Sequence, residues 1–374
     1  MNKFKIFSVA LFASASALQA QDINEVKKQI DAEQFQKAKT SLKSIIKANP
    51  SEGKAYFLLG NIYLNQSVID SAKIAYNDGL KAKDASHFNN IGLGQIDLEN
   101  NDVAAAKAKF ELAKGQARKK DFDEYIYIAK AYMNNSHPDY KAAIATLQIA
   151  KEKNPAEPQV LLALGDAFYG DKNQNEAFSA YRNAFQADNT LIRAKMQLGV
   201  LLKGAKAYQE AVASFNEVIA LSPNYGPVYR ELAQTYYYWA SNVPGRYEQY
   251  VKQALGYYEK YMLLTDYSLA SRMRHADFLI LAKDYKALEI EATKMKELDK
   301  VNSRILRYLG YAAYENGNVD AAISSLQDFV KDPANKVISL DYLYLGKAKI
   351  KKGTNAEGTA VDPVLYAEGI AFIN

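Results

Sequence analysis

Several short stretches of the sequence resemble phosphate-binding motifs. The stretches GDAFYGDK (165–172) and GVLLKGAK (199–206) have the glycine spacing of a phosphate-binding loop. Neither carries the adjacent Gly-Lys-Ser/Thr that holds the phosphates, and no predicted strand precedes them. In the GLG at 92–94, Asp97 stands where a dinucleotide-binding loop has its third glycine. The glycines therefore do not indicate a nucleotide site, and a packing role explains them better.

The residues that serve as nucleophiles or metal ligands show no catalytic arrangement. The chain has no cysteine, which excludes thiolate chemistry and disulfides, and it has no G-x-S-x-G motif. Its three histidines, His87, His137 and His275, are far apart in sequence and lack the HExxH spacing of a zinc site. The many acidic residues lie on predicted helix faces, with no pair that stands out as an acid/base couple. We therefore expect a non-enzymatic protein with no cofactor and no metal.

The composition is that of a globular protein. The 374 residues are 49% hydrophobic and 24% charged, and the formal net charge is only +5. No run of Lys and Arg reaches the density of a nucleic-acid-binding tail. The composition excludes a disordered or fibrous protein, and it gives no indication of a nucleic-acid partner.

The first residues, MNKFKIFSVALFASASALQAQD, predict a secretory signal peptide over 1–20. Lys3 and Lys5 precede an apolar stretch at 6–12, and small residues follow, so we expect cleavage between Ala17 and Gln21. The apolar stretch is too short to span a bilayer, and no later segment is long enough. The mature chain is expected to be exported and soluble, in the periplasm or outside the cell. The segment resembles export signals of Bacteroidota.

A repeated pattern runs through the rest of the chain. The segments LLGNIY (58–63), ALGDAF (163–168), QLGVLL (197–202) and YLGYAA (308–313) align with one another. About twelve residues after each glycine comes an alanine, and four residues later an aromatic or leucine. Gly165 and Gly199 are 34 residues apart.

This pattern resembles the tetratricopeptide repeat (TPR), a helix–turn–helix unit. Its large residues at positions 4, 7, 11 and 24 recur at helical spacing, and small residues at positions 8 and 20 let the two helices cross closely. The resemblance implies an all-α fold, a right-handed superhelical solenoid of about nine to ten TPR units over residues 21–374. First helices would line a concave face and second helices would pack outside. Units are expected to start near residues 19, 53, 87, 122, 158, 192, 226, 269, 303 and 339.

Apart from insertions, three units depart from the pattern. The first shows only its second helix clearly. The unit from 269 has Arg272, His275 and Leu288 at positions 4, 7 and 20, which suggests a looser junction or a partner contact. The last unit begins a second helix and stops, so we expect either a truncated chain or a partner that covers the apolar end.

The stretch ELAQTYYYW (231–239) belongs to the unit from 226. Tyr236 takes the core position 11, and the alanine of position 20 appears only at Ala254, nine residues later than the pattern requires. Both helices should therefore be lengthened around an NVPG turn (242–245), with Trp239 at their far end. In this stretch only Tyr237 and Tyr238 fall at groove positions.

The groove positions of TPR proteins, which are 2, 5, 9, 12 and 13 of the first helix, supply the candidate binding residues. The Lys/Asn clamp that some TPR proteins use for a peptide carboxylate is absent, because Phe57 and Gly92 stand at two of its positions. Between 193 and 314 the groove positions are rich in Arg and Tyr, which suit a polypeptide ligand with carboxylate and apolar side chains. The candidates are Arg193, Met196, Arg230, Gln234, Tyr237, Tyr238, Arg307 and Tyr311.

The most favoured function is a protein-interaction scaffold of the cell envelope that binds a protein or peptide partner. A glycan- or small-molecule-binding solenoid remains an alternative, because tyrosine rings also stack on sugars. An accessory part of a longer enzyme or envelope-assembly protein is a further alternative. The identity of the partner and the oligomeric state stay open at this stage.

Overall fold

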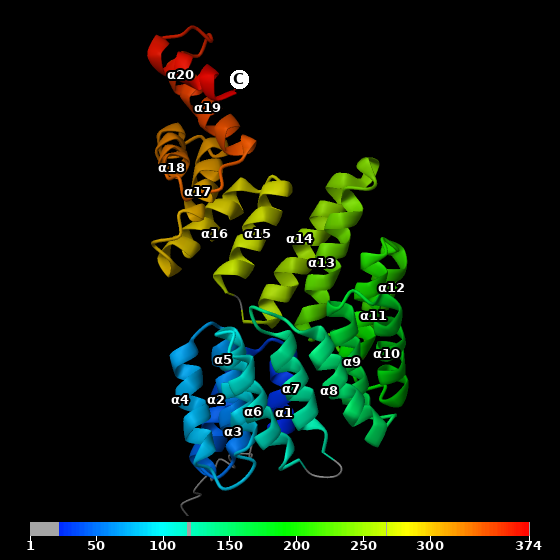
Figure 1. Ribbon diagram of the computed structural model, residues 1–374. Helices are drawn as coiled ribbons and strands as arrows, with labels where there is room; N and C mark the ends of the chain where they lie inside the picture. The colour runs from blue at the N-terminus through cyan, green and yellow to red at the C-terminus, as the bar shows by residue number, and fades with distance from the viewer. Residues whose placement is uncertain (1–21, 118–120, 267, 374) are drawn as a thin grey trace, which may run out of the picture. The chain divides into compact units, whose positions relative to one another are not determined.

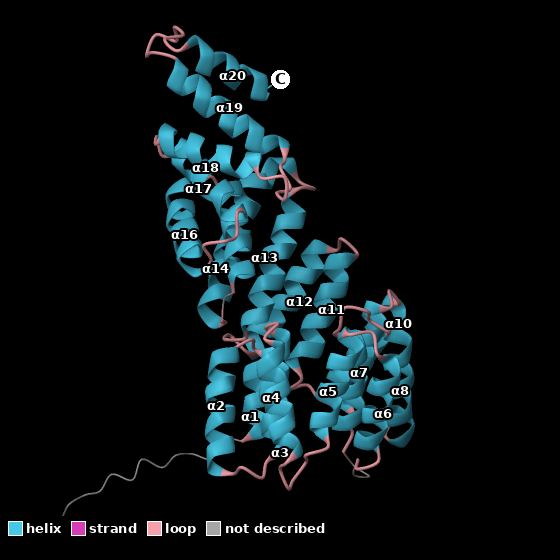
Figure 2. Cartoon of the chain, turned by 60° about the vertical axis from the view of Figure 1, so that its left-hand side comes forward, coloured by secondary structure: helices cyan, strands magenta, loops and turns pink. Residues whose placement is uncertain are grey.

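The computed structural model describes residues 22–117, 121–266 and 268–373. Within these residues the regular structure is helical, with twenty α-helices, one short 3₁₀ helix and no strand (Figures 1 and 2). The predicted signal peptide lies outside the described residues. The all-α fold that the sequence predicts is confirmed.

The helices are grouped into two compact units. Unit 1 consists of the residues up to Asp31 together with Phe35–Pro138, and unit 2 consists of Ala32–Gln34 together with Asp139–Asn374. The helices of unit 1 are α1 (Ile23–Asp31), α2 (Phe35–Ala48), α3 (Gly53–Asn65), α4 (Ile69–Leu80), α5 (Phe88–Glu99), α6 (Val103–Lys114) and α7 (Asp123–Met133).

Unit 2 contains the remaining helices. They are α8 (Tyr140–Lys153), α9 (Pro158–Gly170), α10 (Gln174–Ala187), α11 (Ile192–Gly204), α12 (Tyr208–Leu221), α13 (Gly226–Ala240), η1 (Pro244–Arg246), α14 (Tyr247–Leu264), α15 (Leu269–Leu281), α16 (Tyr285–Leu298), α17 (Arg304–Glu315), α18 (Val319–Lys331), α19 (Ser339–Gly353) and α20 (Pro363–Ile373). In both units consecutive helices pack as pairs, such as α3 with α4 and α13 with α14.

The turn inside each helix pair has a recurring local chemistry. Asn101, Lys172 and Lys283 adopt positive φ values near 60°, which ends the first helix in a left-handed residue. The next residue caps the second helix: Asp102 and Asn173, for example, accept hydrogen bonds from backbone amides of the first turn. Such a cap contributes about 1 kcal/mol. A short polar turn therefore specifies where one helix stops and the next begins.

Small residues allow the paired helices to cross closely. A Cβ atom on Gly60 would lie 2.3 Å from the Tyr76 ring, and one on Gly165 would lie 2.4 Å from the Tyr181 ring. The same close approach occurs at Gly199 and Gly310. These are positions 8 and 24 of the repeat, so the packing role expected for the glycines is confirmed.

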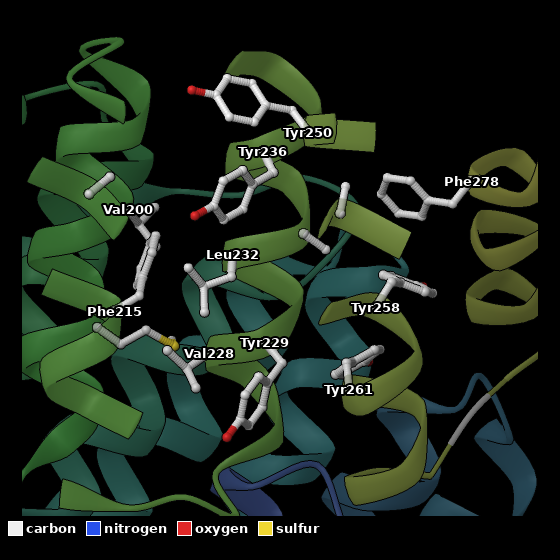
Figure 3. Close-up of a cluster of buried hydrophobic side chains, with 14 of the residues drawn as sticks. Val200, Phe215, Val228, Tyr229, Leu232, Tyr236, Tyr250, Tyr258, Tyr261 and Phe278 are labelled. Atoms are coloured by element: carbon white, nitrogen blue, oxygen red, sulfur yellow. The ribbon is translucent and has the colours of Figure 1, made fainter. Parts of the chain in front are cut away.

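The α13–α14 pair is the longest, with 15 and 18 residues joined through η1. This confirms the expected lengthening around the NVPG turn. Trp239 stacks against Tyr236 at 6.0 Å, lies 4.7 Å from Tyr250 of α14, and reaches Tyr208 of α12 at 6.1 Å between ring centroids. Figure 3 shows the cluster of buried side chains that these helices form around Leu232.

The two ends of the repeat array differ from the sequence expectation in detail. Helix α1 forms a first helix of nine residues before α2, although the repeat pattern made only the second helix evident. At the other end α20 packs on α19, where the Gly346 and Gly369 backbones approach each other. Among the described helices, none is both long and apolar enough to cross a membrane.

Candidate functional site

The predicted groove residues lie on the first helices of unit 2, and the structure shows that most of them already have partners. Arg193 of α11 donates to Asp166 of α9 at 2.9 Å between Nη2 and Oδ2. Asp166 also accepts from the Tyr181 hydroxyl at 3.0 Å. The guanidinium is therefore held between neighbouring helices, although a quarter of its side chain stays exposed.

A second polar link joins α11 to α13. The Lys203 Nζ lies 2.5 Å from a carboxylate oxygen of Glu231 and 2.8 Å from the side-chain oxygen of Gln234. Lys203 and Glu231 are largely buried, so these charges are neutralised within the fold. Gln234, a predicted groove residue, keeps part of its side chain accessible beside this pair.

Arg230 lies on α13 beside the same carboxylate. Its Nε is 3.5 Å from Glu231, and its guanidinium lies 5.3 Å from the ring centroid of Tyr261 on α14. The side chain is only 28% exposed. Arg230 therefore contributes to the link between α13 and α14 and presents a restricted charged edge.

Two tyrosines on this face remain open to solvent. Tyr238 of α13 is 48% exposed and Tyr169 of α9 is 41% exposed. Partial burial raises the pKa of Tyr169, and the negative charge of Glu231 and Tyr238 raise it further. Tyr237 is less open, because its ring packs edge-on against Phe278 at 6.0 Å.

The predicted residues of α17 are committed to a buried carboxylate. Arg307 forms two 2.7 Å bonds to the oxygens of Asp341, which is fully buried. The Tyr311 hydroxyl donates to the same carboxylate at 2.6 Å, and its ring stacks on Tyr344 at 4.4 Å. Burial alone would lower the pKa of Arg307, and the hydrogen bonds to Asp341 raise it. This cluster fastens α17 to α19 and leaves little for a ligand.

Two members of the candidate set must be corrected because they are in the core. Met196 is only 4% exposed and belongs to the same buried cluster as Leu232, and Tyr311 is 1% exposed. Groove positions face solvent only where the neighbouring first helix does not cover them. The accessible candidates are Arg193, Gln234, Tyr237 and Tyr238, with Arg230 at the margin, and Tyr169 joins them.

The acidic partners change the electrostatic interpretation of this face. The sequence indicated groove positions rich in Arg and Tyr, yet Asp166, Glu231 and Asp341 each neutralise a basic side chain from a neighbouring helix. The repeat pattern could have predicted the Asp166–Arg193 ion pair, because the two residues occupy position 9 of one unit and position 2 of the next. Asp277 and Arg304, 3.5 Å apart, occupy the same two positions.

In unit 1 the corresponding face is filled by its own side chains. The Tyr127 ring of α7 packs edge-on against Phe57 at 4.8 Å and against Phe88 at 6.0 Å. Asp123 of the same helix pairs with Lys27 at 2.7 Å and with Lys54. Burial raises the pKa of Asp123, but the two lysines bring it below its ordinary value. The groove positions Lys54, Phe57 and Phe88 of unit 1 are therefore used for internal packing.

The irregular repeat from 269 carries a buried ionic cluster. Arg272 donates to Glu291 of α16 at 2.7 Å, and His275 lies 3.6 Å from the same carboxylate. Burial raises the pKa of Glu291, whereas His275 and Arg272 lower it below its ordinary value. Arg272 and His275, at core positions of this repeat, thus share the buried carboxylate of Glu291 inside unit 2.

In the part of the chain that the structure describes, no three His, Asp or Glu side chains lie close enough together to hold a metal ion. The open face combines two exposed tyrosine rings, Tyr169 and Tyr238, with ion pairs whose charges are neutralised within the fold. Such a surface can supply contact area and hydrogen bonds to a ligand.

Comparison with solved structures finds other helical-repeat chains. Pseudomonas aeruginosa pilF is 22% identical, with a TM-score of 0.47, covering 59% of this chain and 94% of that one. A human IFIT1 dimer with PPP-AAAA is 13% identical, with a TM-score of 0.46 and coverage of 80% and 70%. A tetratricopeptide repeat protein from Parabacteroides merdae is 15% identical, with a TM-score of 0.42 and coverage of 68% and 99%.

Among curated proteins no match to the chain is found. Family models give a direct assignment. A tetratricopeptide-repeat model matches residues 24–87, 128–191 and 286–336, and a second one matches 192–225. Together the matched residues make up more than half of the sequence. With its all-α pairs of helices and their close glycine crossings, the chain belongs to the tetratricopeptide-repeat family.

Proposed function

We propose that this protein is a non-catalytic interaction scaffold of the cell envelope that binds a segment of a partner polypeptide across α9, α11 and α13. The observation that carries the proposal is the pair of exposed rings on two first helices, Tyr169 of α9 and Tyr238 of α13, together with the Lys203–Glu231–Gln234 link that joins α11 to α13. Rigid aromatic rings at a partly polar surface are the usual anchors of protein interfaces.

The polar side chains of this face suit a polypeptide ligand. Gln234 retains an accessible side-chain amide that can bond to carboxylates or main-chain groups, while the tyrosines supply apolar contact. Because the ion pairs are formed within the fold, the face is organised before a ligand arrives, which lowers the entropy cost of binding.

The test compares two double variants of the full-length protein by affinity purification and mass spectrometry from the native host. Tyr169→Ala/Tyr238→Ala should lose the main partner, because each anchor is expected to contribute about 2 kcal/mol. Phe178→Ala/Tyr247→Ala removes two similarly exposed aromatics from the second helices α10 and α14 and should leave the partner list unchanged. Equal recovery with both variants would refute the assignment of the face.

Glycan binding is the rival outcome at the same rings. Thermal stabilisation of the wild type by a member of a glycan panel, lost in Tyr169→Ala/Tyr238→Ala, would replace the polypeptide ligand with a sugar.

Export is a separate part of the proposal. It is supported by Lys3, Lys5, the apolar stretch at 6–12 and the small residues before Gln21. N-terminal sequencing of the protein from envelope fractions should find a chain that starts between residues 18 and 21. An intact Met1 end on the native protein would contradict export by this signal.

A further inference from the structure

Unit 1 contains a hollow that the groove positions do not include. It has a volume of about 350 Å³ and opens among α2, α3 and α4. Its apolar lining comes from Ile46 of α2, from Tyr56, Leu59 and Tyr63 of α3, and from Ile74 and Ala75 of α4. Its size is that of a small ligand pocket, enough for one or two large side chains of a partner.

One exposed aliphatic side chain, Ile74, lies at the rim of the hollow. Ile74 is 63% exposed although it lies beside the buried Ala75 and Leu59. Together with Ile46, Tyr56, Leu59 and Tyr63, it forms the apolar part of a lining that also includes Lys43, Lys47, Ser71 and Asp78.

One side of the hollow is positively charged. Lys43 and Lys47 line it from α2, one helical turn apart, and Lys39 precedes them by another turn. Helix α2 has no acidic residue, and among the described residues neither Lys43 nor Lys47 forms an ion pair. The one acidic side chain in the lining, Asp78, pairs with Lys81 at 2.8 Å. The surface therefore has charge available for an acidic ligand.

We propose that this hollow docks an acidic amphipathic helix of a partner polypeptide. The partner's apolar residues would enter between Tyr56, Tyr63 and Ile74, and its carboxylates would face Lys43 and Lys47. A helix fits better than an extended segment, because the lining consists of side chains on helices and offers no strand edge for main-chain pairing. This site is separate from the proposed face on α9, α11 and α13.

The experiment uses the full-length mature protein and a fluorescein-labelled synthetic helix of about 18 residues, long enough for five turns. The peptide carries leucine at helical spacing with glutamate at the flanking positions, and a matched peptide carries lysine in place of glutamate. Fluorescence anisotropy should show binding of the glutamate peptide only. Binding should weaken with salt, as expected for exposed charges.

Two matched double variants locate the binding. Lys43→Glu/Lys47→Glu should weaken binding on the order of tenfold, from two reversed charges at a partly apolar site. Lys37→Glu/Lys73→Glu makes the same change of net charge at exposed positions of α2 and α4 outside the hollow, and should change affinity less than about twofold. The variant Ile74→Ser tests the apolar part and should weaken binding by a similar order.

Each contrary result overturns the proposal. Equal effects of the two double variants would place the peptide elsewhere, and equal binding of the lysine peptide would remove the role of charge. No peptide binding, together with a dimer of the wild type that Ile74→Glu abolishes, would identify a second copy as the occupant.

Binding that survives Tyr169→Ala/Tyr238→Ala separates this site from the proposed function.

Discussion

The α3–α4 pair and the α13–α14 pair carry the same residue types at three core positions but bury them differently. Tyr56, Leu59 and Tyr63 of α3 correspond to Tyr229, Leu232 and Tyr236 of α13. The tyrosines of α13 are buried, whereas those of α3 line an open hollow. The first helix alone therefore does not decide whether its apolar face is closed.

The second helix makes the difference. Three residues after the crossing alanine, α14 has Tyr257, whose ring stacks on Tyr229 at 6.4 Å and on Tyr236 at 5.6 Å. At the same place α4 has only Ala75. A single large side chain thus fills in unit 2 the space that stays hollow in unit 1.

On the face formed by the first helices the difference is reversed: unit 1 is closed there and unit 2 is open. Unit 1 fills that face with Tyr127 and Asp123, whereas unit 2 leaves Tyr169 and Tyr238 exposed. Each unit closes one surface with its own side chains and leaves another available. This reciprocal arrangement is consistent with the two separate binding surfaces proposed above, and it can be broken at specific residues.

The largest expected effect is from Tyr257→Ala, which should open in unit 2 a hollow like that of unit 1. Loss of the ring between Tyr229 and Tyr236 should lower the free energy of unfolding by about 3 kcal/mol. Trp239 is the only tryptophan and lies in the same cluster, so its fluorescence during denaturant unfolding reports on this region.

The control for that variant is Tyr247→Ala, which removes a partly exposed ring from the same helix. It should cost less than about 1 kcal/mol. If Tyr257→Ala were no more destabilising than Tyr247→Ala, Tyr257 could not be the residue that closes the α13–α14 pair.

The second prediction adds a ring instead of removing one. Ala75→Tyr should be accommodated in the hollow, raise the stability of α3 and α4 by about 1 kcal/mol, and block the acidic peptide. Ala180 occupies the same repeat position in α10 and is buried to the same degree as Ala75, but it does not line this hollow. Ala180→Tyr should therefore cost about 2 kcal/mol through overpacking.

Hydrogen–deuterium exchange, followed on peptides from α3–α4 and α9–α10, measures both changes locally. The prediction requires that Ala75→Tyr raises local stability and that Ala180→Tyr lowers it. Destabilisation of comparable size at both sites would mean that the hollow does not admit a side chain from α4.

Local features of the fold follow from sequence because their causes are close in the chain. The glycine at position 8 meets the large residue at position 24 of the same unit, as Gly165 meets Tyr181. The position of Ala254 likewise revealed the lengthened α13 and α14. In each case both contacting residues lie within one repeat, so the pattern records the contact.

The site was harder to predict because its contacts join different repeats. Arg307 has the residue type and position of a groove ligand, yet its carboxylate partner, Asp341, comes from α19. Met196 was placed by position, but α13 buries it. The sequence did not predict the hollow, because the Tyr-Leu-Tyr pattern of α3 matches the repeat. The missing side chain becomes evident only when Ala75 is aligned with Tyr257, and the insertion in the unit from 226 obscures that alignment.

The third prediction concerns the closed first-helix face of unit 1. Asp123→Asn removes the charge that Lys27 and Lys54 share, and should lower the local stability of α7 by about 1–2 kcal/mol at neutral pH. The pKa of Asp123 lies below its ordinary value in the folded chain, so its contribution is present above the unfolded pKa of about 3.9 and is lost as the pH falls through the folded value.

Hydrogen exchange of α7 at pH 7, compared with urea unfolding followed by circular dichroism from pH 7 down to pH 2.5, checks the sign. The wild type and Asp123→Asn should converge in acid. A difference that persists at the lowest pH would show that the two lysines do not stabilise the ionised carboxylate.

The smallest effect is expected at the open face of unit 2. Tyr169→Ala and Tyr238→Ala should each change the free energy of unfolding by no more than about 0.5 kcal/mol, because nearly half of each ring is already in water. Denaturant unfolding followed through Trp239 fluorescence measures this, with Tyr257→Ala as the positive control. A loss near that of Tyr257→Ala would mean that the two rings hold unit 2 together as Tyr127 holds unit 1. Stability unchanged while the partner is lost would instead show that these rings are retained for binding.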